Sequence, residues 1–470
     1  MLLWGAYQEL FRHQNILWQI RWGFSCLGLY RLCPIRIVAC VDDSPTHDLI
    51  AQRGGIRFFS LESKTGRHTH GRDADLDRIL PSFREPIESA LGERSDGRWV
   101  VVSPLASRAL AAFAVETGRE LVCPPPELGH WLNDKANFLA ALSAIGLPRL
   151  PGRWLRLAEA RYAEIASEMG AATFVAQLAR GLSGSGTAFI GSEEEYARAG
   201  TRFGDVPTWV APDVGNLSFN INAIAMESGV VVSAPNVQLA GLPMLCCRRR
   251  GMYCGNDYTA TRDVPAETLV TVEEQTERIG RWLASLGFRG LFGLDFVADP
   301  SSGRVYAVDL NPRWQGSTNL LTQAEVKAGR LPLAVAELAY RMGLLGETEI
   351  LRHKDGFLQP LMASQVSLRC GAPGWVRVAG DVQPGIYSLA PGGAFLRAGL
   401  ELVDLGAADE ILVIGGVPRQ GAWIEEGAHV LRASAEWQVM DLSRMKPLPW
   451  VEPAVRNLYE LVDLRPAEAG

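Results

Sequence analysis

The sequence lacks several features that would assign it to a common class of protein. No apolar run in its 470 residues approaches the roughly 20 residues needed to span a membrane. Its 46 Lys and Arg residues are outnumbered by 52 Asp and Glu residues, so no basic excess favours binding to nucleic acid by bulk charge. We therefore expect neither a membrane span nor a nucleic-acid partner.

Cysteine and histidine patterns typical of metal sites are also missing. The eight cysteines are scattered, and Cys246, Cys247 and Cys254 form no pair of Cys-x-x-Cys motifs, so a zinc site is not expected. Reduced thiols predict a cytoplasmic protein. His68 and His70 lie in the polar stretch 60–80, which reads as an exposed loop; they would bind a metal only with a third ligand.

The first 33 residues are rich in aromatic residues, including Trp4, Trp18 and Trp22, but have no signal-peptide pattern. We expect a pair of amphipathic helices that pack on the first domain or on a second copy in a homodimer. An interfacial membrane helix is the alternative.

The chain is too long for one core and suggests about three domains. Strand-like runs at 35–42, 99–103 and 121–123, with a helical pattern at 105–117, predict an open α/β sheet in the first part. No Gly-x-Gly-x-x-Gly follows the first predicted strand, so nothing indicates dinucleotide binding there.

The stretch from Gly290 to Thr318 is the most informative part of the sequence. Two apolar runs, Leu291–Ala298 and Arg304–Leu310, are separated by Asp299–Gly303. Turn residues between two β-prone runs predict a β-hairpin with a five-residue loop.

Polar residues on one face of this hairpin predict a metal site. With the five-residue loop, Asp295 and Asp309 lie diagonally opposite each other, roughly 7–8 Å apart, and Asn311 points the same way. Two carboxylates and an amide oxygen are hard ligands of the kind that Mg²⁺ prefers. Arg313 and Gln315 follow, where a cation would suit a transferring phosphoryl group. A surface hairpin with two solvated acids is the alternative, but the acids interrupt apolar strands, where unpaired burial is costly.

This hairpin resembles the metal-binding hairpin of the ATP-grasp superfamily, in which an acid precedes the turn and an acid-x-Asn-x-Arg sequence follows it. The resemblance implies that Asp295, Asp309 and Asn311 hold Mg²⁺ on the phosphates of ATP. It also implies that Arg313 stabilises the transferred phosphoryl group and that Gln315 helps to position the acid. Family members often have Glu where this sequence has Asp, which is shorter.

Two upstream segments are similar to the same family. Asn133-Asp134-Lys135 begins a predicted helix that ends at Gly146-Leu147-Pro148, and Arg180–Thr187 is a Gly- and Ser-rich loop whose backbone N–H groups can approach phosphate. The sequence departs from the family at Gln177, where many members have Lys, and Arg180 is the candidate replacement. The candidate ATP contacts here are Lys135, Gln177, Arg180, Gly184, Ser185, Gly186 and Thr187.

Further candidate contacts lie between residues 208 and 257. By its order in the chain, Thr208–Asp213 is the strand where adenine would sit, with the backbones of Val210 and Ala211 on the base and Asp213 near the ribose. The triple arginine is either a solvated face or a site for a substrate carboxylate or phosphate. The candidate substrate contacts are Asn220, Asn222, Arg248, Arg249 and Arg250.

We therefore expect an α/β and α+β protein with an ATP-grasp fold in four parts. These are an N-terminal helical segment with an α/β domain (1–123), a small ATP-grasp subdomain with the Gly-rich loop (124–208), a large subdomain with the metal hairpin (209–350) and a β-rich C-terminal domain (351–470).

The resemblance implies an ATP- and Mg²⁺-dependent ligase that activates a carboxylate as an acyl phosphate and joins it to an amine. Its partners would be small-molecule carboxylates and amines, as in the ligases of small-peptide or specialised-metabolite pathways. One alternative is another phosphoryl chemistry, a kinase or a carboxylase. The other is a nucleotide-binding regulatory protein without turnover.

Overall fold

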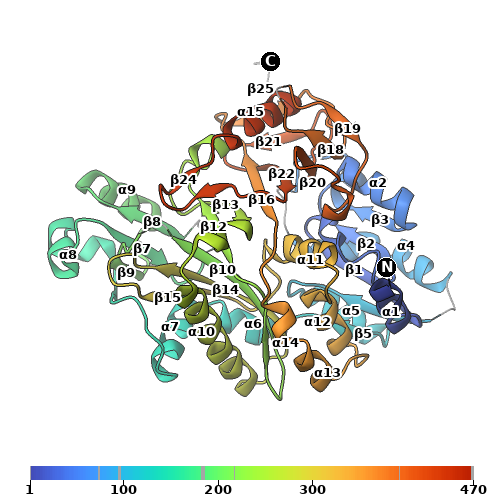
Figure 1. Cartoon of the computed structure of the whole chain (residues 1–470), viewed down its shortest axis with the longest axis horizontal. Coiled ribbons are helices and arrows are strands. Elements are labelled where there is room, and N and C mark those ends of the chain that lie inside the picture. Colours follow the sequence, from blue (N-terminus) through green and yellow to red (C-terminus); the bar gives the residue numbers. More distant parts are fainter. Residues whose placement is uncertain are drawn as a thin grey trace.

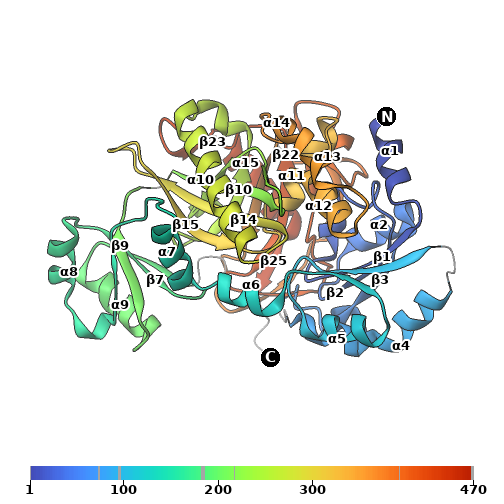
Figure 2. The ribbon, with the colours of Figure 1, turned by 90° about the horizontal axis from the view of Figure 1, so that it is seen from below.

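The computed structural model describes residues 2–71, 75–93, 97–181, 186–215, 217–390 and 392–466. One long sheet forms the centre of the molecule. A parallel-sheet domain lies at one end, and a small antiparallel subdomain, which carries α8 and α9, projects at the other (Figures 1 and 2).

The N-terminal domain is built on a five-stranded parallel sheet of order β3-β2-β1-β4-β5. Its strands are β1 (Gln14–Ile20), β2 (Ile35–Cys40), β3 (Arg57–Ser60), β4 (Arg98–Val102) and β5 (Glu120–Val122). Its helices are α1 (Leu2–Leu10), α2 (Pro45–Gly54), α3 (Leu61–Thr65), α4 (Ile79–Gly92) and α5 (Arg108–Glu116). The predicted open α/β sheet is confirmed.

The predicted pair of N-terminal helices is wrong, because residues 14–20 form the central strand of this sheet. β1 is paired with β2 on one side and β4 on the other. Its apolar side chains are buried on both faces, and a short apolar run of that kind cannot be distinguished from a buried helix by periodicity. Trp18 is fully buried on β1 and packs edge-on against Trp314, with ring centroids 5.2 Å apart.

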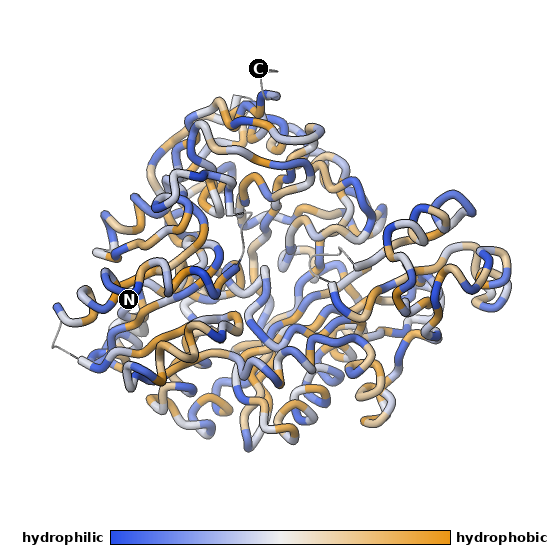
Figure 3. Tube along the Cα trace, turned by 180° about the vertical axis from the view of Figure 1, so that it is seen from behind, coloured by the Kyte–Doolittle hydropathy of each residue, from blue (hydrophilic) through white to orange (hydrophobic). Residues whose placement is uncertain are grey.

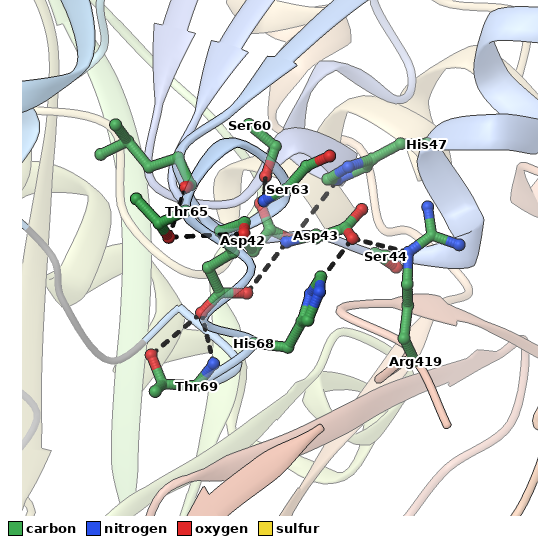
Figure 4. Close-up of polar contacts among 12 residues, drawn as sticks. Asp42, Asp43, Ser44, His47, Ser60, Ser63, Thr65, His68, Thr69 and Arg419 are labelled. Carbon is green, nitrogen blue, oxygen red and sulfur yellow. Dashed lines mark hydrogen bonds and ion pairs between the residues drawn. The ribbon is translucent and has the colours of Figure 1, made fainter. Parts of the chain in front are cut away.

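The predicted exposed loop at 60–80 is only partly correct over its described part: residues 63–67, 75, 77 and 78 are exposed, but the segment is not a loop throughout. The segment contains α3, which Ser60 caps by accepting a hydrogen bond from the Ser63 backbone N–H (3.1 Å), and His70 is only 4% exposed. Figure 4 shows that the polar side chains here bind one another; for example, His68 Nδ1 lies 3.3 Å from Asp43 Oδ2. The polar residues of this stretch therefore divide between internal contacts and contact with water.

The small subdomain has an antiparallel sheet of order β6-β9-β7-β8. Its strands are β6 (Arg153–Leu155), β7 (Phe174–Leu178), β8 (Thr187–Ile190) and β9 (Thr208–Pro212). The helices of this part of the chain are α6 (Pro126–Leu132), α7 (Lys135–Ala144), α8 (Tyr162–Met169) and α9 (Glu193–Phe203).

The long central sheet has the order β15-β14-β10-β12-β13-β16-β22-β20-β18-β19, with β11 paired to β10. Its strands before residue 350 are β10 (Ser218–Ala225), β11 (Val230–Val232), β12 (Asn236–Ala240), β13 (Tyr253–Asp257), β14 (Gly290–Ala298) and β15 (Val305–Asn311). Those after it are β16 (Ser364–Arg369), β18 (Gly385–Ser388), β19 (Phe395–Arg397), β20 (Glu410–Gly415) and β22 (His429–Ala435). The pairing of β13 with β16 carries one sheet across the predicted boundary at residue 350.

Helices and short strands complete this half of the molecule. The helices are α10 (Ala266–Ser285), α11 (Thr318–Lys327), α12 (Leu333–Arg341), α13 (Glu347–Arg352), α14 (Lys354–Phe357) and α15 (Val451–Val462). The short strands are β17 (Trp375–Val378), β21 (Trp423–Glu425), β23 (Met440–Asp441), β24 (Lys446–Pro447) and β25 (Leu464–Pro466).

The largest apolar core joins the two halves of the chain, because β1 and β2 share it with α11, α12 and β20. Hydrophobic residues recur along the buried strands in Figure 3. All eight cysteines are in described segments and have free thiols. Among the described helices, none is long and apolar enough to cross a membrane.

Candidate functional site

β14 and β15 form the predicted hairpin, but their register differs from the prediction. Asp295 pairs directly with Asp309, Gly293 pairs with Asn311, and a bulge shifts the register between Asp295 and Phe296. The predicted diagonal placement is therefore wrong for two reasons. Ala298 pairs with Val305 and not with Arg304, so the turn is one residue longer than predicted, and the bulge shifts the register by one more residue. Directly opposed residues are roughly 4.5–5.5 Å apart at Cβ, so the two acids are closer than predicted.

The two carboxylates share one electrostatic environment. Burial, followed by the charge of Asp309, raises the pKa of Asp295 to about 6, although hydrogen bonding from Asn220 acts in the opposite direction. Asn220 Nδ2 donates to Asp295 Oδ1 at 2.6 Å, and Gln238 Nε2 donates to the same oxygen at 3.3 Å. Lys135 forms an ion pair with Asp309.

Lys135 lies at the start of α7, where the sequence predicted a helix to begin, and its side chain reaches the hairpin. Asp134 caps this helix by accepting a hydrogen bond from the Ala136 backbone N–H at 3.0 Å. The cap fixes where the helix begins and so directs the first helical side chain towards β15.

Gln315 lies over the hairpin in space that a glycine leaves open. A Cβ at Gly293 would lie 1.9 Å from Gln315 Cδ, so the position of this side chain requires the glycine. Gln315 Nε2 donates to Ile221 O at 2.8 Å, and its Oε1 accepts from Asn220 Nδ2 at 2.8 Å. Gln315 is thus held beside the acids.

Asn311 and Arg313 complete the predicted group. Arg313 Nη2 donates to Asn311 Oδ1 at 3.0 Å, and its Nη1 donates to Trp314 O at 2.9 Å. Burial lowers the pKa of Arg313, while the charges of Asp309 and Asp295 act to raise it. Two opposed carboxylates and an amide oxygen form a set of hard oxygen donors that fits Mg²⁺.

A cavity of about 940 Å³ lies over the hairpin and brings together side chains from all parts of the fold. The predicted site residues in its lining are Lys135, Gln177, Gly186, Thr187, Ala211, Asp213, Asn220, Arg250, Asp295, Asp309, Asn311, Arg313 and Gln315. Residues that the sequence placed up to 180 positions apart therefore share one cavity.

The Gly-rich segment reaches this cavity through its two ends. Gly181 and Gly186 line it, and Gln177 Nε2 donates to Thr187 Oγ1 at 3.3 Å. Gly184 and Ser185 lie outside the described residues. Arg180 points instead to the start of α7, where its Nε lies 3.2 Å from Asp134 Oδ2.

At the predicted adenine position, Asp213 forms an ion pair with Arg250, whose Nη2 donates to Asp213 Oδ1 at 3.1 Å. The guanidinium also lies over the ring of Phe189, 4.6 Å from its centroid. Ala211 lines the cavity, whereas Val210 is fully buried and paired on both sides, with β6 and β7. Contact with a base is thus better placed at Ala211 than at Val210.

Three predicted substrate contacts lie outside the described lining of the cavity. Asn222 is fully buried, where its Nδ2 donates to Ser317 Oγ at 3.0 Å. Arg248 is exposed, with Nη1 3.0 Å from Glu426 Oε1, and Arg249 is exposed as well.

The cavity also contains residues that the sequence analysis missed. The principal ones are Arg21, Trp22, His70, Tyr253, Arg369, His429 and Arg432. Arg369 ends β16, which has two Ser and one Gln among its six residues, and Arg432 lies within β22 between Leu431 and Ala433. A charge between apolar residues is the same signal that marked Asp295, so it was available for Arg432 but not for Arg369.

No family model matches the sequence. The fold, in contrast, is similar to several solved structures. Biotin carboxylase from Campylobacter jejuni has a TM-score of 0.58 at 13% identity, over 90% of this chain and 87% of that one. Carboxyaminoimidazole ribonucleotide synthase from Aspergillus clavatus has a TM-score of 0.55 at 12% identity, over 95% and 99%.

N5-carboxyaminoimidazole ribonucleotide synthetase from Thermus thermophilus has a TM-score of 0.53 at 15% identity, over 97% of this chain and 100% of that one. The similarity therefore covers nearly the whole length of both chains, from the parallel-sheet domain to the last strands. These enzymes are ATP-grasp proteins. The chain thus has the ATP-grasp fold, as its hairpin predicted.

Proposed function

We propose that this protein is an ATP- and Mg²⁺-dependent ligase that activates a carboxylate as an acyl phosphate and joins it to an amine. The observation that carries the proposal is the convergence of Lys135, Asp295, Asp309, Asn311 and Arg313 on one cavity of an ATP-grasp fold. Similar structures support the cofactors. The Aspergillus clavatus synthase was solved with ATP, and the biotin carboxylase domain of the Hydrogenobacter thermophilus 2-oxoglutarate carboxylase was solved with MgADP.

Each residue has a role that follows from its position. Asp295, Asp309 and Asn311 would hold Mg²⁺, which would supply positive charge to the phosphates of ATP. Lys135 brings a further cation to the hairpin. Arg313 is fixed by Asn311 and a backbone carbonyl, so its guanidinium would offset the charge of a phosphoryl group without first having to reorient.

A carboxylase is the second candidate, because biotin carboxylase is among the similar structures and the Hydrogenobacter domain was solved with bicarbonate. It would use the same nucleotide site. We favour the ligase, with small-molecule acids and amines as substrates in a reducing, cytoplasmic setting. A role in small-peptide or specialised-metabolite synthesis is the finer part of this proposal.

Product analysis tests both candidates. The full chain is incubated with MgATP and a panel of amino acids and small carboxylates, with and without bicarbonate. We expect ADP and phosphate that depend on an acid and an amine. Formation of AMP with equal pyrophosphate would exclude acyl-phosphate chemistry, and dependence on bicarbonate would favour the carboxylase. Absence of ATP turnover with every pair would favour a regulatory nucleotide-binding protein.

A further inference from the structure

Three arginines from distant parts of the chain gather at one wall of the cavity. Arg21 follows β1, Arg369 ends β16 and Arg432 lies on β22. β16 and β22 are paired, with Ser367 opposite Arg432. Burial is the largest cause that lowers the pKa of Arg21; Asp42 acts to raise it, but Arg369 and Arg432 lower it further. The three guanidinium groups are therefore close enough to repel one another.

Two of these arginines have a buried donor without an acceptor. Each donates one hydrogen bond to a backbone carbonyl, at 2.9 Å from Arg21, 3.1 Å from Arg369 and 3.4 Å from Arg432. The Nε atoms of Arg369 and Arg432 are buried without a hydrogen-bond partner. Across the described segments, no carboxylate forms an ion pair with any of the three. All three residues are half-buried. Since a cation that is partly removed from water without an ion-pair partner is costly, this wall favours an anionic ligand.

Two histidines complete the wall without adding charge to it. His70 Nε2 donates to the backbone carbonyl of Val430 at 2.7 Å, which leaves Nδ1 as an acceptor. Burial lowers the pKa of His70 to about 4. His429 is 9% exposed, neither of its ring nitrogens has a hydrogen-bond partner, and burial followed by the charge of Arg432 lowers its pKa. Both imidazoles are therefore neutral near pH 7 and add no charge of either sign to the wall.

Aromatic contacts hold the wall in place. The Trp22 ring lies 5.2 Å from that of His70 and 5.0 Å from that of His429, centroid to centroid. The guanidinium of Arg21 lies 5.2 Å from the Trp22 ring centroid, and that of Arg432 lies 5.5 Å from the Phe24 ring centroid. Little rearrangement is then needed before a ligand binds.

The wall lies in the same cavity as the metal hairpin. Tyr253 lines this cavity and is near enough to both for their charges to act on it: burial raises its pKa, Arg432 and Arg369 act to lower it, and Asp295 acts to raise it. Arg432 Nη1 also donates to the carbonyl of Gly316, which follows Gln315. A group bound at the arginines would therefore be close to the hairpin while being held by residues other than Lys135.

We propose that Arg21, Arg369 and Arg432 bind a doubly charged oxyanion of the substrate that reacts with ATP, either a phosphate monoester or a pair of carboxylates. This inference rests on the proposed function and specifies the class of its substrate. One carboxylate would leave two of the three cations unpaired. A phosphate dianion has three terminal oxygens and a dicarboxylate has four oxygens, so either can accept paired hydrogen bonds from several guanidinium groups.

Isothermal titration calorimetry at constant ionic strength tests the inference, with inorganic phosphate and succinate as probes. The variants are Arg21→Gln, Arg369→Gln and Arg432→Lys; the last keeps its charge so that the fold is less disturbed. We expect probe affinity to fall at least about tenfold in each, the scale of one lost charge-assisted hydrogen bond. Arg456→Gln on the exposed face of α15 is the matched control and should bind like the wild type.

A second variant separates this wall from the nucleotide site. Lys135→Met should weaken ATP binding and leave probe binding unchanged, whereas Arg432→Lys should weaken probe binding and leave ATP binding nearly unchanged. Circular dichroism and melting curves establish that each variant is folded.

The outcomes separate the two ligand sources and the two proposals. Binding of phosphate alone identifies a phosphate monoester, and binding of succinate alone identifies a dicarboxylate. Wild-type protein that binds ATP but neither probe, or probe binding that survives all three arginine substitutions, overturns the inference and leaves the ligase proposal standing. Arginine-dependent probe binding by a protein that neither binds nor consumes ATP overturns the ligase proposal alone.

Discussion

Lys135 and Asp309 form an ion pair although 174 residues separate them in the chain. The pair joins the first residue of α7 to the second strand of the hairpin, and it lies beside Asp295, so one cation faces two opposed acids and offsets the charge of only one of them. The same ammonium group is the predicted phosphate contact. Substitutions at its two ends therefore test different parts of the proposed site.

The variant Lys135→Met removes the cation and keeps most of the side-chain length. We expect ATP affinity to fall about tenfold or more, because a hydrogen bond between charged groups contributes roughly 1.5–3 kcal/mol. Calorimetry with MgATP measures the change. Lys354→Met, which removes a surface partner of Glu277, is the control. Wild-type affinity in Lys135→Met would show that this lysine does not contact the nucleotide.

The variant Asp309→Asn tests the metal site at nearly constant volume. The substitution removes one negative charge from the metal ligands. We expect ATP turnover to fall about 10²–10³-fold, the loss typical when a group that stabilises charge in the transition state is removed. ADP release is followed across a range of Mg²⁺ concentrations. Asp299→Asn is the control, since this acid lies in the turn of the same hairpin and accepts hydrogen bonds only from Ser301 and Ser302 among described side chains. Undiminished ADP release by Asp309→Asn at limiting Mg²⁺ would contradict the assignment.

The variant Gln177→Lys restores the cation that many ATP-grasp proteins have on this strand. Because Gln177 lines the cavity beside Thr187, we expect MgATP affinity to rise about two- to tenfold, as a charged donor binds phosphate more strongly than a neutral amide. Gln359→Lys, at an exposed position, controls for the added charge. A loss of affinity in Gln177→Lys would indicate that β7 does not face the phosphates.

The buried carboxyl of Glu325 predicts a pH dependence of stability. Burial raises its pKa to about 8 from an ordinary 4.5. Between these values the folded protein holds a proton that the unfolded chain releases, so the stabilising contribution of Glu325 is complete below pH 4.5 and is lost as pH rises towards 8.

Melting temperatures of the wild type and Glu325→Gln across this range measure that contribution. The amide keeps an acceptor for the Leu333 backbone N–H, which lies 2.9 Å from Glu325 Oε2. We expect a smaller fall in melting temperature for the variant as pH rises. Glu274→Gln, at an exposed position on α10, should follow the wild type. Parallel curves for the wild type and Glu325→Gln would contradict the prediction.

Much of the candidate site could be predicted from the sequence because the signals for it are local. Turn residues at Asp299–Gly303 required a hairpin, and acids within its apolar strands required partners. Asp134 capped a helix with an apolar face, which fixed the start of α7 and hence Lys135. Each of these signals lies within a few residues of the structure that it predicts, and each was confirmed.

The fold alone decided the features that depend on distant partners. The direct pairing of Asp295 with Asp309 results from a bulge together with a turn one residue longer than predicted. β1 is a strand because two others, one of them beyond residue 97, pair with its two edges. One sheet contains strands from both sides of the predicted domain boundary at residue 350, because β16 pairs with β13. Arg21 and Arg432 meet only when the N-terminal domain docks on the C-terminal strands, a contact also made by Ser44 Oγ to Val417 O at 2.7 Å, across 373 residues. A sequence pattern records which side chains are near in the chain, whereas the arginine wall depends on packing between segments that no local pattern relates.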